Sequence, residues 1–250
     1  MIMEIISGGQ TGANRAALDV AIELGIPHGG WVPKGRMTDL GRLPDQYVMQ
    51  ETTSISDPAW TKMNVADSDG TLIVSHGELT GGSAFTRDVA AKHRKPCLHI
   101  DLDSLTESVA TEIVSNWVDG RHIEILNVAG PCATEDSKIY DATKSLLRKV
   151  IRSLLPKTVD EAVDILLYRM PLRDKARTAN SEEADLSGLY KSLGSYIRNR
   201  FLVRSGNPAL LESCAQATGR ESIREYEASL VIIKKLWRRL RNVRALRAAD

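Results

Sequence analysis

The sequence predicts an α/β protein in which a doubly wound, mainly parallel Rossmann-like sheet precedes a smaller all-helical domain. Two observations predict this fold. Before Pro156, short apolar runs alternate with helical stretches, which is typical of a parallel sheet covered by helices on both faces. After Pro156 we find no convincing strand, and the charge balance changes sign: residues 1–155 hold 15 Lys and Arg against 20 Asp and Glu, whereas residues 156–250 hold 18 against 12. We therefore expect a ligand-binding domain at 1–155 and a helical domain at 156–250.

Local patterns predict where the elements of the first domain lie. Residues 2–6 form a compact apolar run, which predicts a strand, and residues 14–24 show helical spacing that ends at Gly25. Three later strands are expected at 71–75, 97–101 and 122–130, and three helices at 83–93, 104–118 and 136–154. The stretch 28–67 is rich in glycine, proline and charge, so it is expected to be mostly loop with a short strand near 47–50.

The composition excludes several classes of protein. The 250 residues are 42% hydrophobic and 26% charged with a net charge of +1, as in a folded globular protein. No apolar run approaches the roughly 18–20 residues of a membrane span, and no signal-peptide pattern is found, so we expect a cytoplasmic protein without membrane contact. Aromatic residues make up only 5%, so nucleic acid is not an expected partner. Three cysteines without a CxxC pair predict neither a disulfide framework nor a structural metal.

The first loop that could bind a ligand is SGGQTG, which follows the strand at 2–6 and precedes a helix. Glycines allow close approach of backbone N–H groups, and a helix start adds unpaired donors, so an anion such as a phosphate suits this loop. The loop is neither GxxxxGK[ST] nor GxGxxG, so NAD is not indicated. A tight turn without a ligand is the alternative. The candidate ligand-binding residues here are Gly8, Gly9, Gln10, Thr11 and Gly12.

A second loop repeats the strand–glycine–helix arrangement after the strand at 71–75. Its candidate ligand-binding residues are Thr80, Gly81, Gly82, Ser83 and Thr86. Ser83 could instead simply cap the following helix. A weaker third turn, Ala129–Gly130–Pro131, follows the strand at 122–130. Loops at the carboxyl ends of adjacent strands can face one crevice, so we expect the first two to converge on one ligand.

Charged residues outside these loops add further candidates. Lys34, Gly35 and Arg36 form a basic loop that could clamp an oxyanion or could simply be solvated. Glu51 and Asp88 are candidate catalytic acids, although no spacing pairs them persuasively.

The segments GGQTGANRAALD and LTGGSAFT together resemble the putative molybdenum carrier family, a Rossmann-like group of the SLOG superfamily related to lysine-decarboxylase-like phosphoribohydrolases. The resemblance covers about residues 3–150. It implies a doubly wound α/β domain, an anionic ligand that is either molybdenum cofactor (a phosphorylated pterin) or a nucleotide-like molecule, and a homo-oligomer. Val32 stands where this family often has Cys, which weakens any proposal of sulfur contact with the metal.

Three functional hypotheses follow from the loops and the resemblance. The leading one is a non-catalytic carrier that holds the phosphate on the helix starts after Gly12 and Gly82. The second is a nucleotide phosphoribohydrolase, which the sequence disfavours because the related pattern PGGxGTxxE is replaced here by TGGSAFTRD. The third is a sensor of a nucleotide-type ligand whose helical tail binds a partner.

The tail is similar to a small helical domain of unknown function, from which no role carries over. Its last predicted helix spans 225–246. An apolar stripe on this helix comprises Leu230, Ile233, Trp237 and Leu240. A basic face comprises Lys234, Lys235, Arg238, Arg239, Arg241 and Arg244. This face is either a solvated surface or a contact for an acidic surface or nucleic acid.

Overall fold

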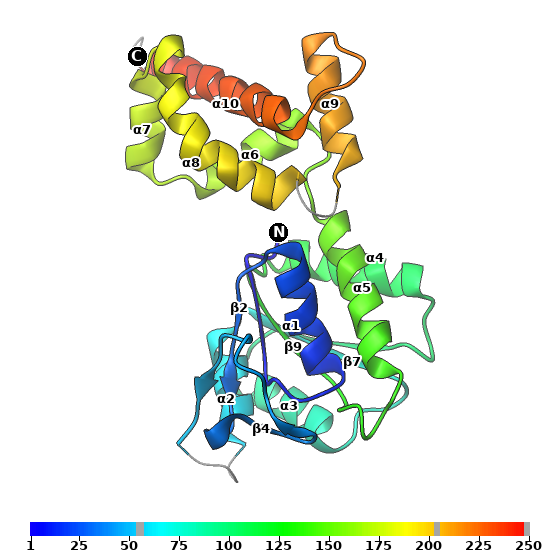
Figure 1. Ribbon diagram of the computed structural model, residues 1–250. Coiled ribbons are helices and arrows are strands. Elements are labelled where there is room, and N and C mark those ends of the chain that lie inside the picture. Colours follow the sequence, from blue (N-terminus) through cyan, green and yellow to red (C-terminus); the bar gives the residue numbers. More distant parts are fainter. Residues whose placement is uncertain (54–57, 203–205, 248–250) are drawn as a thin grey trace. The chain divides into compact units, whose positions relative to one another are not determined.

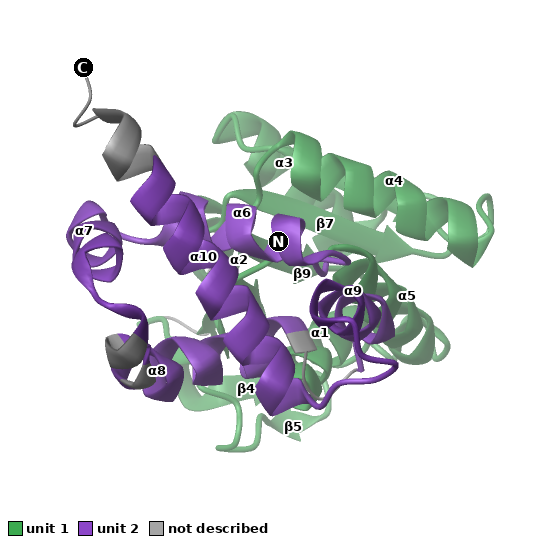
Figure 2. Cartoon of the chain, turned by 90° about the horizontal axis from the view of Figure 1, so that it is seen from above, with its two compact units in different colours: residues 1–154 green, residues 155–250 purple. Residues whose placement is uncertain are grey.

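The structure of the protein is a computed structural model that describes residues 1–53, 58–202 and 206–247. The chain forms two compact units, residues 1–154 and residues 155–250. Figure 2 distinguishes the two units by colour. None of the described helices is both long and apolar enough to cross a membrane.

Unit 1 is built on a five-stranded parallel sheet, which confirms the predicted fold class. Its strands are β1 (Glu4–Ser7), β2 (His28–Gly29), β7 (Gly70–Ser75), β8 (Cys97–Asp101) and β9 (Ile125–Ala129). They lie in the order β2-β1-β9-β7-β8. The last strand of the unit therefore separates β1 from β7, and the loops after these three strands meet at one edge of the sheet.

Helices cover both faces of this sheet (Figure 1). On one face α1 (Ala13–Leu24), α4 (Glu107–Gly120) and α5 (Ile139–Ser153) pack together over the main hydrophobic core. On the other face lie α2 (Ala59–Asp67) and α3 (Gly81–Lys92), which pack on each other through Val65, Val89 and Ala90. The sheet is thus doubly wound. Its inner strand β7, which lies between β9 and β8, is buried along its whole length, as expected for a strand covered on both sides.

The middle segment, 28–67, differs from the prediction. The strand predicted near 47–50 is instead β6 (Gln50–Glu51), which pairs with β3 (Trp31–Val32). A hairpin joins β4 (Met37–Thr38) to β5 (Gly41–Arg42), after a 3-10 turn at Lys34–Arg36.

Helix α2 was not predicted, because its sequence AWTKMNVAD has little apolar periodicity. Its buried residues are only Asn64 and Val65. Asn64 fixes the helix through two hydrogen bonds: its Oδ1 accepts from the Trp31 N–H at 2.8 Å, and its Nδ2 donates to the Trp31 carbonyl at 3.0 Å. A polar side chain rather than an apolar stripe therefore attaches α2 to β3.

The described residues of unit 2 form helices and the turns that connect them. Its elements are α6 (Val159–Arg169), α7 (Leu172–Asn180), η2 (Glu183–Leu186), α8 (Ser187–Ile197), η3 (Arg198–Leu202), α9 (Pro208–Thr218) and α10 (Glu225–Arg247). Helix α10 packs against α6, α7, α8 and α9. Of its predicted stripe, Ile233, Trp237 and Leu240 are buried and Leu230 is half-buried. The side chain of Arg244 lies outside the described part of the chain.

Candidate functional site

A cleft of about 360 Å³ lies in unit 1 where the central strands end. The starts of α1, α2 and α3 and the loop after β9 form its walls. Its lining residues are Gln10, Asn14, Pro58, Trp60, Thr61, Gly81, Gly82, Ser83, Phe85, Thr86, Ala129, Gly130, Cys132 and Glu135. The volume falls within the range of small-molecule sites.

The loop after β1 packs tightly on the loop after β9. Gly12 has φ of 72°, and a Cβ there would lie 2.4 Å from the Pro131 carbonyl oxygen, so only glycine fits. The N–H of Ala13 donates to that same carbonyl at 3.2 Å. The loop after β7 is also tied to the loop after β9, since His76 Nδ1 lies 2.6 Å from Asp136 Oδ2. Burial would raise the pKa of Asp136, but the hydrogen bonds from His76 and from the N–H groups of Lys138 and Ile139, with the charge of His76, together lower it.

The start of α3 presents backbone donors to the cleft. Thr80 is the N-cap residue but makes no side-chain capping bond, and the helix begins at Gly81, so Ser83 does not cap it. The N–H groups of Gly81 and Gly82 have no hydrogen-bond partner among the described residues, whereas that of Ser83 bonds to the Thr80 carbonyl at 3.1 Å. A Cβ added at Gly82 would have no atom within 4 Å. An acceptor placed here would meet open donors and the positive end of the helix dipole.

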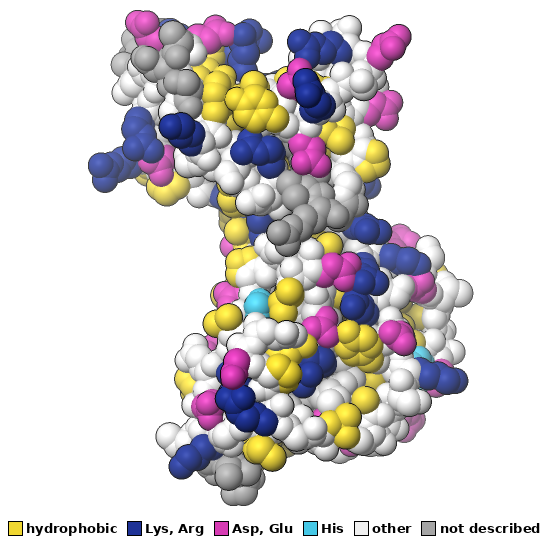
Figure 3. All heavy atoms as spheres, in the orientation of Figure 1, with side chains coloured by type: hydrophobic (Ala, Val, Ile, Leu, Met, Phe, Trp, Pro, Cys, Tyr) yellow, Lys and Arg dark blue, Asp and Glu magenta, His cyan; other side chains and the backbone are white. Residues whose placement is uncertain are grey.

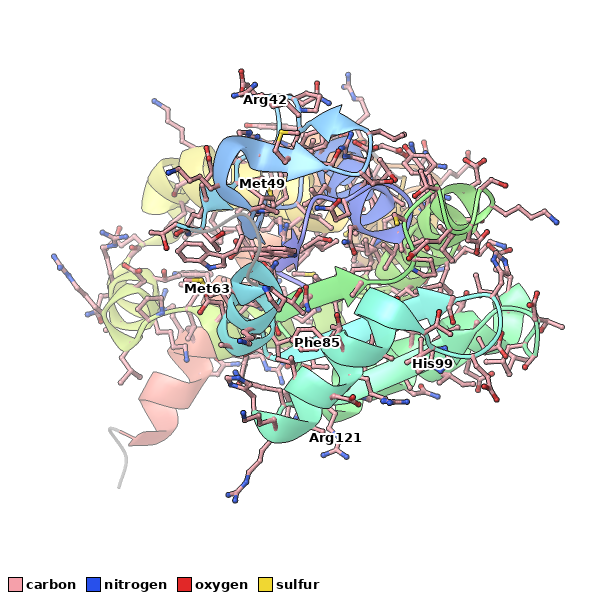
Figure 4. All side chains as sticks on the ribbon, turned by 90° about the horizontal axis from the view of Figure 1, so that it is seen from below. Arg42, Met49, Met63, Phe85, His99 and Arg121 are labelled. Atoms are coloured by element: carbon pink, nitrogen blue, oxygen red, sulfur yellow. The ribbon has the colours of Figure 1, made fainter. Side chains whose placement is uncertain are left out.

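Aromatic side chains and amides provide the rest of the cleft wall. Phe85 lies between α3 and α2 (Figure 4), and Trp60 of α2 packs close to Gly8. Two aromatic rings suit a flat ring system, because offset and edge-on ring contacts are favourable. Gln10 is oriented by the 37–39 loop: its Oε1 accepts from the Asp39 N–H at 3.0 Å. The Oδ1 of Asn14 is buried without a hydrogen-bond partner among the described residues, which leaves an acceptor beside the cleft.

The ionisable groups of the described lining are Glu135 and Cys132. The Oε2 of Glu135 accepts from the Cys132 N–H at 3.1 Å. Burial raises the pKa of the Cys132 thiol, so this thiol is neutral near pH 7. No Lys or Arg belongs to the described lining. Attraction of an anion to this cleft would therefore come from backbone N–H groups rather than from cationic side chains.

Thr11 of the first glycine loop is bound by a carboxylate of the chain itself. Its N–H donates to Asp39 Oδ1 at 3.0 Å, and its hydroxyl donates to Asp39 Oδ2. The Thr11 hydroxyl also accepts from the Ala133 N–H at 2.9 Å. Burial would raise the pKa of Asp39, yet the bonds from Thr11 and Thr134 lower it below its usual range. Asp39 thus holds the hairpin onto the loops after β1 and β9, and the donors of Thr11 are already used.

The other predicted residues of the first loop and the basic loop lie outside the described lining. Gly9 packs against Val32 and Leu43. Arg36 is buried, and its guanidinium donates to the carbonyls of Leu43 at 3.3 Å, Pro44 at 2.9 Å and Tyr47 at 2.8 Å. Its role in the structure is to fix the 43–47 loop. Lys34 is exposed and, like Gly35, Gly8 and Thr80, is not part of the lining.

The two candidate catalytic acids are not brought together. Glu51 accepts from the Gly35 N–H at 2.6 Å on the β6 side of the 3-10 turn. Asp88 is exposed on α3 and accepts from Arg87 Nε at 3.0 Å. Neither residue lines the cleft. The described residues contain no group of three His, Cys, Asp or Glu side chains that could hold a metal ion.

Sequence reasoning missed several lining residues, chiefly Trp60, Thr61, Phe85, Cys132 and Glu135. The first two belong to α2, which was expected to be loop. A signal for the last two was present: the Ala129–Gly130–Pro131 turn follows a strand, and Cys132 and Glu135 come directly after it.

Comparison with known proteins identifies the family of unit 1. The family model described as the circularly permutated YpsA SLOG family matches residues 5–151, more than half of the chain. The chain belongs to this family. The predicted membership in the SLOG group is confirmed.

A solved structure agrees with this membership. The crystal structure of a protein from Syntrophus aciditrophicus SB, described as a putative molybdenum carrier protein, is 53% identical, with a TM-score of 0.59. The match covers 60% of this chain and 94% of that one. A second family model, a domain of unknown function (DUF6794), matches residues 155–240. No curated protein matches the chain.

The family description agrees with the strand order. If the strands are renumbered from β7, the order becomes 2-1-3-4-5, which is the order of flavodoxin-like doubly wound sheets. In that order ligands bind at the switch point between the first and third strands. For this member of the circularly permutated YpsA SLOG family, those strands are β7 and β9, and the cleft is lined from the loops that follow both.

Proposed function

We propose that unit 1 binds a phosphorylated small molecule with a flat ring system, a pterin or a nucleotide, in the cleft at the ends of β7 and β9. The observation that carries this proposal is the open pair of N–H groups at Gly81 and Gly82. In the renumbered sheet α3 follows the first strand, and the first strand–helix turn of doubly wound folds is where phosphate groups bind. The phosphate is therefore assigned to α3 and not to α1, where Thr11 already binds Asp39.

Molybdenum cofactor is the specific ligand we propose, with a nucleotide as the alternative. The solved relative is described as a putative molybdenum carrier protein, and its 53% identity to this chain supports a shared ligand. The lining fits a phosphorylated pterin in three ways: aromatic rings at Trp60 and Phe85, the amide oxygen of Asn14 that is unpartnered among the described residues, and open backbone donors on α3. Cys132 provides a neutral thiol in the lining, which can act as a weak hydrogen-bond donor.

Calorimetric titration of the full chain tests the proposal. The titrants are molybdenum cofactor, a nucleoside monophosphate, molybdate and inorganic phosphate. We expect the phosphorylated ring compounds to bind more tightly than phosphate or molybdate alone, since the ring contacts add to the phosphate contacts. Failure of folded protein to bind any of the four would overturn the proposal.

The variant Gly82→Ala sharpens this experiment. Its methyl group would occupy the open space above the α3 donors, so we expect affinity to fall about tenfold or more, or about 1.4 kcal/mol. The fold should be retained, because Ala is favoured over Gly within helices by up to about 1 kcal/mol. Gly120→Ala at the end of α4 is the matched control, since its added Cβ also meets no atom within 4 Å but lies outside the cleft. If both variants bind the ligand as tightly as the natural chain, the phosphate does not bind at the start of α3.

The proposal is one of binding without catalysis. Glu51 and Asp88, the acids suggested for N-glycosidic hydrolysis, do not line the cleft. Incubation with nucleoside monophosphates should release no free base. Base release that is lost in Asp88→Asn would favour the phosphoribohydrolase instead.

A further inference from the structure

Unit 2 contains a groove between α9 and α10 with a volume of about 700 Å³. We call it the basic groove. Its lining residues are Ala217, Thr218, Val231, Lys234, Lys235, Arg238, Arg239 and Asn242. The α10 members recur every three or four residues, so they form one face of that helix. Lys and Arg side chains are seen around the notch beside α9 in Figure 3.

All ionisable residues of the described groove lining are cations. Three of them also form ion pairs with carboxylates of neighbouring elements that do not line the groove. Lys235 Nζ lies 2.9 Å from Asp160 Oδ2, Arg239 Nη1 lies 2.6 Å from Asp164 Oδ1, and Lys234 pairs with Glu183. The pairs are roughly half-exposed, and such pairs stabilise a fold by at most about 1 kcal/mol each. An incoming anion could therefore share or replace these partners at little cost.

Arg238 is the residue that a purely structural role does not explain. It is exposed and makes no ion pair with any residue that the structure describes, although its charge is near enough to Glu183, the partner of Lys234, to help lower the pKa of that carboxyl. By contrast, Arg241 on the same helix stacks on the Trp237 ring at 4.9 Å and does not line the groove. The four cations face three carboxylates, so one positive charge of the groove remains for a bound anion to balance.

We propose that the basic groove binds a small polyanion with adjacent phosphate groups. Successive cation pairs, 234/235 and 238/239, lie one helical turn apart, about 6 Å along the axis, so neighbouring phosphates can be contacted together. Arg contributes the two-pronged contact that phosphate oxygens favour. Among the described residues the lining has no aromatic side chain on which nucleic-acid bases could stack. Its apolar residues there are only Ala217 and Val231, which form no pocket for an apolar side chain of a peptide. The volume suits a compact ligand.

Titration of the full chain with inorganic tripolyphosphate tests this site. We expect binding that weakens as salt is raised. In Arg238→Gln the affinity should fall about fivefold to tenfold, because one unpaired cation of the groove is removed. Arg241→Gln is the matched control: it makes the same change of charge on the same helix and should keep the natural affinity. Thermal unfolding of both variants checks that each is folded.

Two further ligands distinguish a site for a small polyanion from a site for an acidic protein or a nucleic acid. A hexaglutamate peptide and a single-stranded oligonucleotide should each bind more weakly than tripolyphosphate. Tighter binding of either would overturn the proposal in favour of an acidic protein or a nucleic acid. Absence of tripolyphosphate binding at low salt, or equal losses in Arg238→Gln and Arg241→Gln, would also overturn it. Gly82→Ala should leave this titration unchanged, so the result is independent of the cleft in unit 1.

Discussion

Gly12 and Gly82 lie at the starts of helices that follow two strands of the same sheet, yet they are glycine for different reasons. Gly12 has a positive φ, and a side chain there would collide with the backbone at Pro131. Gly82 has an ordinary helical backbone and free space around it. The fold explains the first glycine. For the second we propose a bound molecule as the reason, so substitution of each glycine should have a different effect.

Gly12→Ala should destabilise unit 1 by about 1–3 kcal/mol, because the new methyl group adds backbone strain and a clash. Urea unfolding at pH 7 measures the loss. Gly82→Ala serves as its control and should unfold no earlier than the natural chain. A Gly12→Ala protein of undiminished stability would contradict the close packing of the loops after β1 and β9.

Asp39 predicts a dependence of stability on pH. Its folded pKa lies below the ordinary value of about 3.9, so its contribution is present above about pH 4 and is lost as the pH falls through the folded pKa. Asp39→Asn should cost about 1 kcal/mol at pH 7, and the difference from the natural chain should shrink below pH 4. Asp88→Asn, which removes an exposed acid of α3, is the control and should cost little stability at pH 7. A pH-independent difference would mean that the carboxylate charge is not what holds the hairpin.

Cys132 offers a chemical readout of the cleft. Because burial raises the pKa of its thiol, alkylation by iodoacetamide at pH 7 should be slow and should accelerate at higher pH. A molecule bound in the cleft should protect Cys132 further, as mass spectrometry of the labelled peptides would report. Cys214, which is buried with a pKa of about 11, should remain unlabelled with or without the ligand. If the ligand binds but leaves the labelling of Cys132 unchanged, it binds elsewhere.

At the scale of elements, α2 shows why some helices could not be predicted from the sequence. Strands and helices with strong apolar patterns, such as β7 and α1, were predicted because burial of a repeated face decides their structure. Helix α2 has no such face, and its attachment by Asn64 is visible only once Trp31 is placed beside it. The same limit applies to the site. The place of the α3 glycines in the cleft could be predicted from the local sequence. The role of Arg36 could not, because its guanidinium donates to carbonyls of the 43–47 loop, which lie near it only in the folded protein.

Asn64→Ala should therefore loosen α2 and the wall of the cleft. The substitution removes two hydrogen bonds and leaves the N–H and carbonyl of Trp31 without these partners. The free energy of unfolding in urea should therefore fall by about 1–3 kcal/mol. Ala66→Ser, on the exposed side of the same helix, is the control and should have little effect. A similar stability of both variants would show that α2 is held by other contacts.

At the scale of the whole molecule, we propose that the two compact units are separate domains with separate cores. In that case they should unfold in two transitions. Leu146→Ala, a buried change in unit 1, should cost about 2–5 kcal/mol and lower only one transition in a calorimetric scan. Ile233→Ala in unit 2 should lower only the other. A single transition that shifts in both variants would mean that the chain folds as one cooperative domain.

The position of β9 constrains how the protein is made. Strand β1 bonds to β2, and β7 bonds to β8, but nothing joins these two pairs until β9 is inserted between them. During synthesis, more than a hundred residues must leave the ribosome before the strand that unites the sheet is available. Parallel pairing over such sequence distances is slow, so the nascent chain carries two incomplete half-sheets with exposed edges for several seconds. The permuted order of the strands thus delays the closure of the sheet until the last strand of unit 1 has been made.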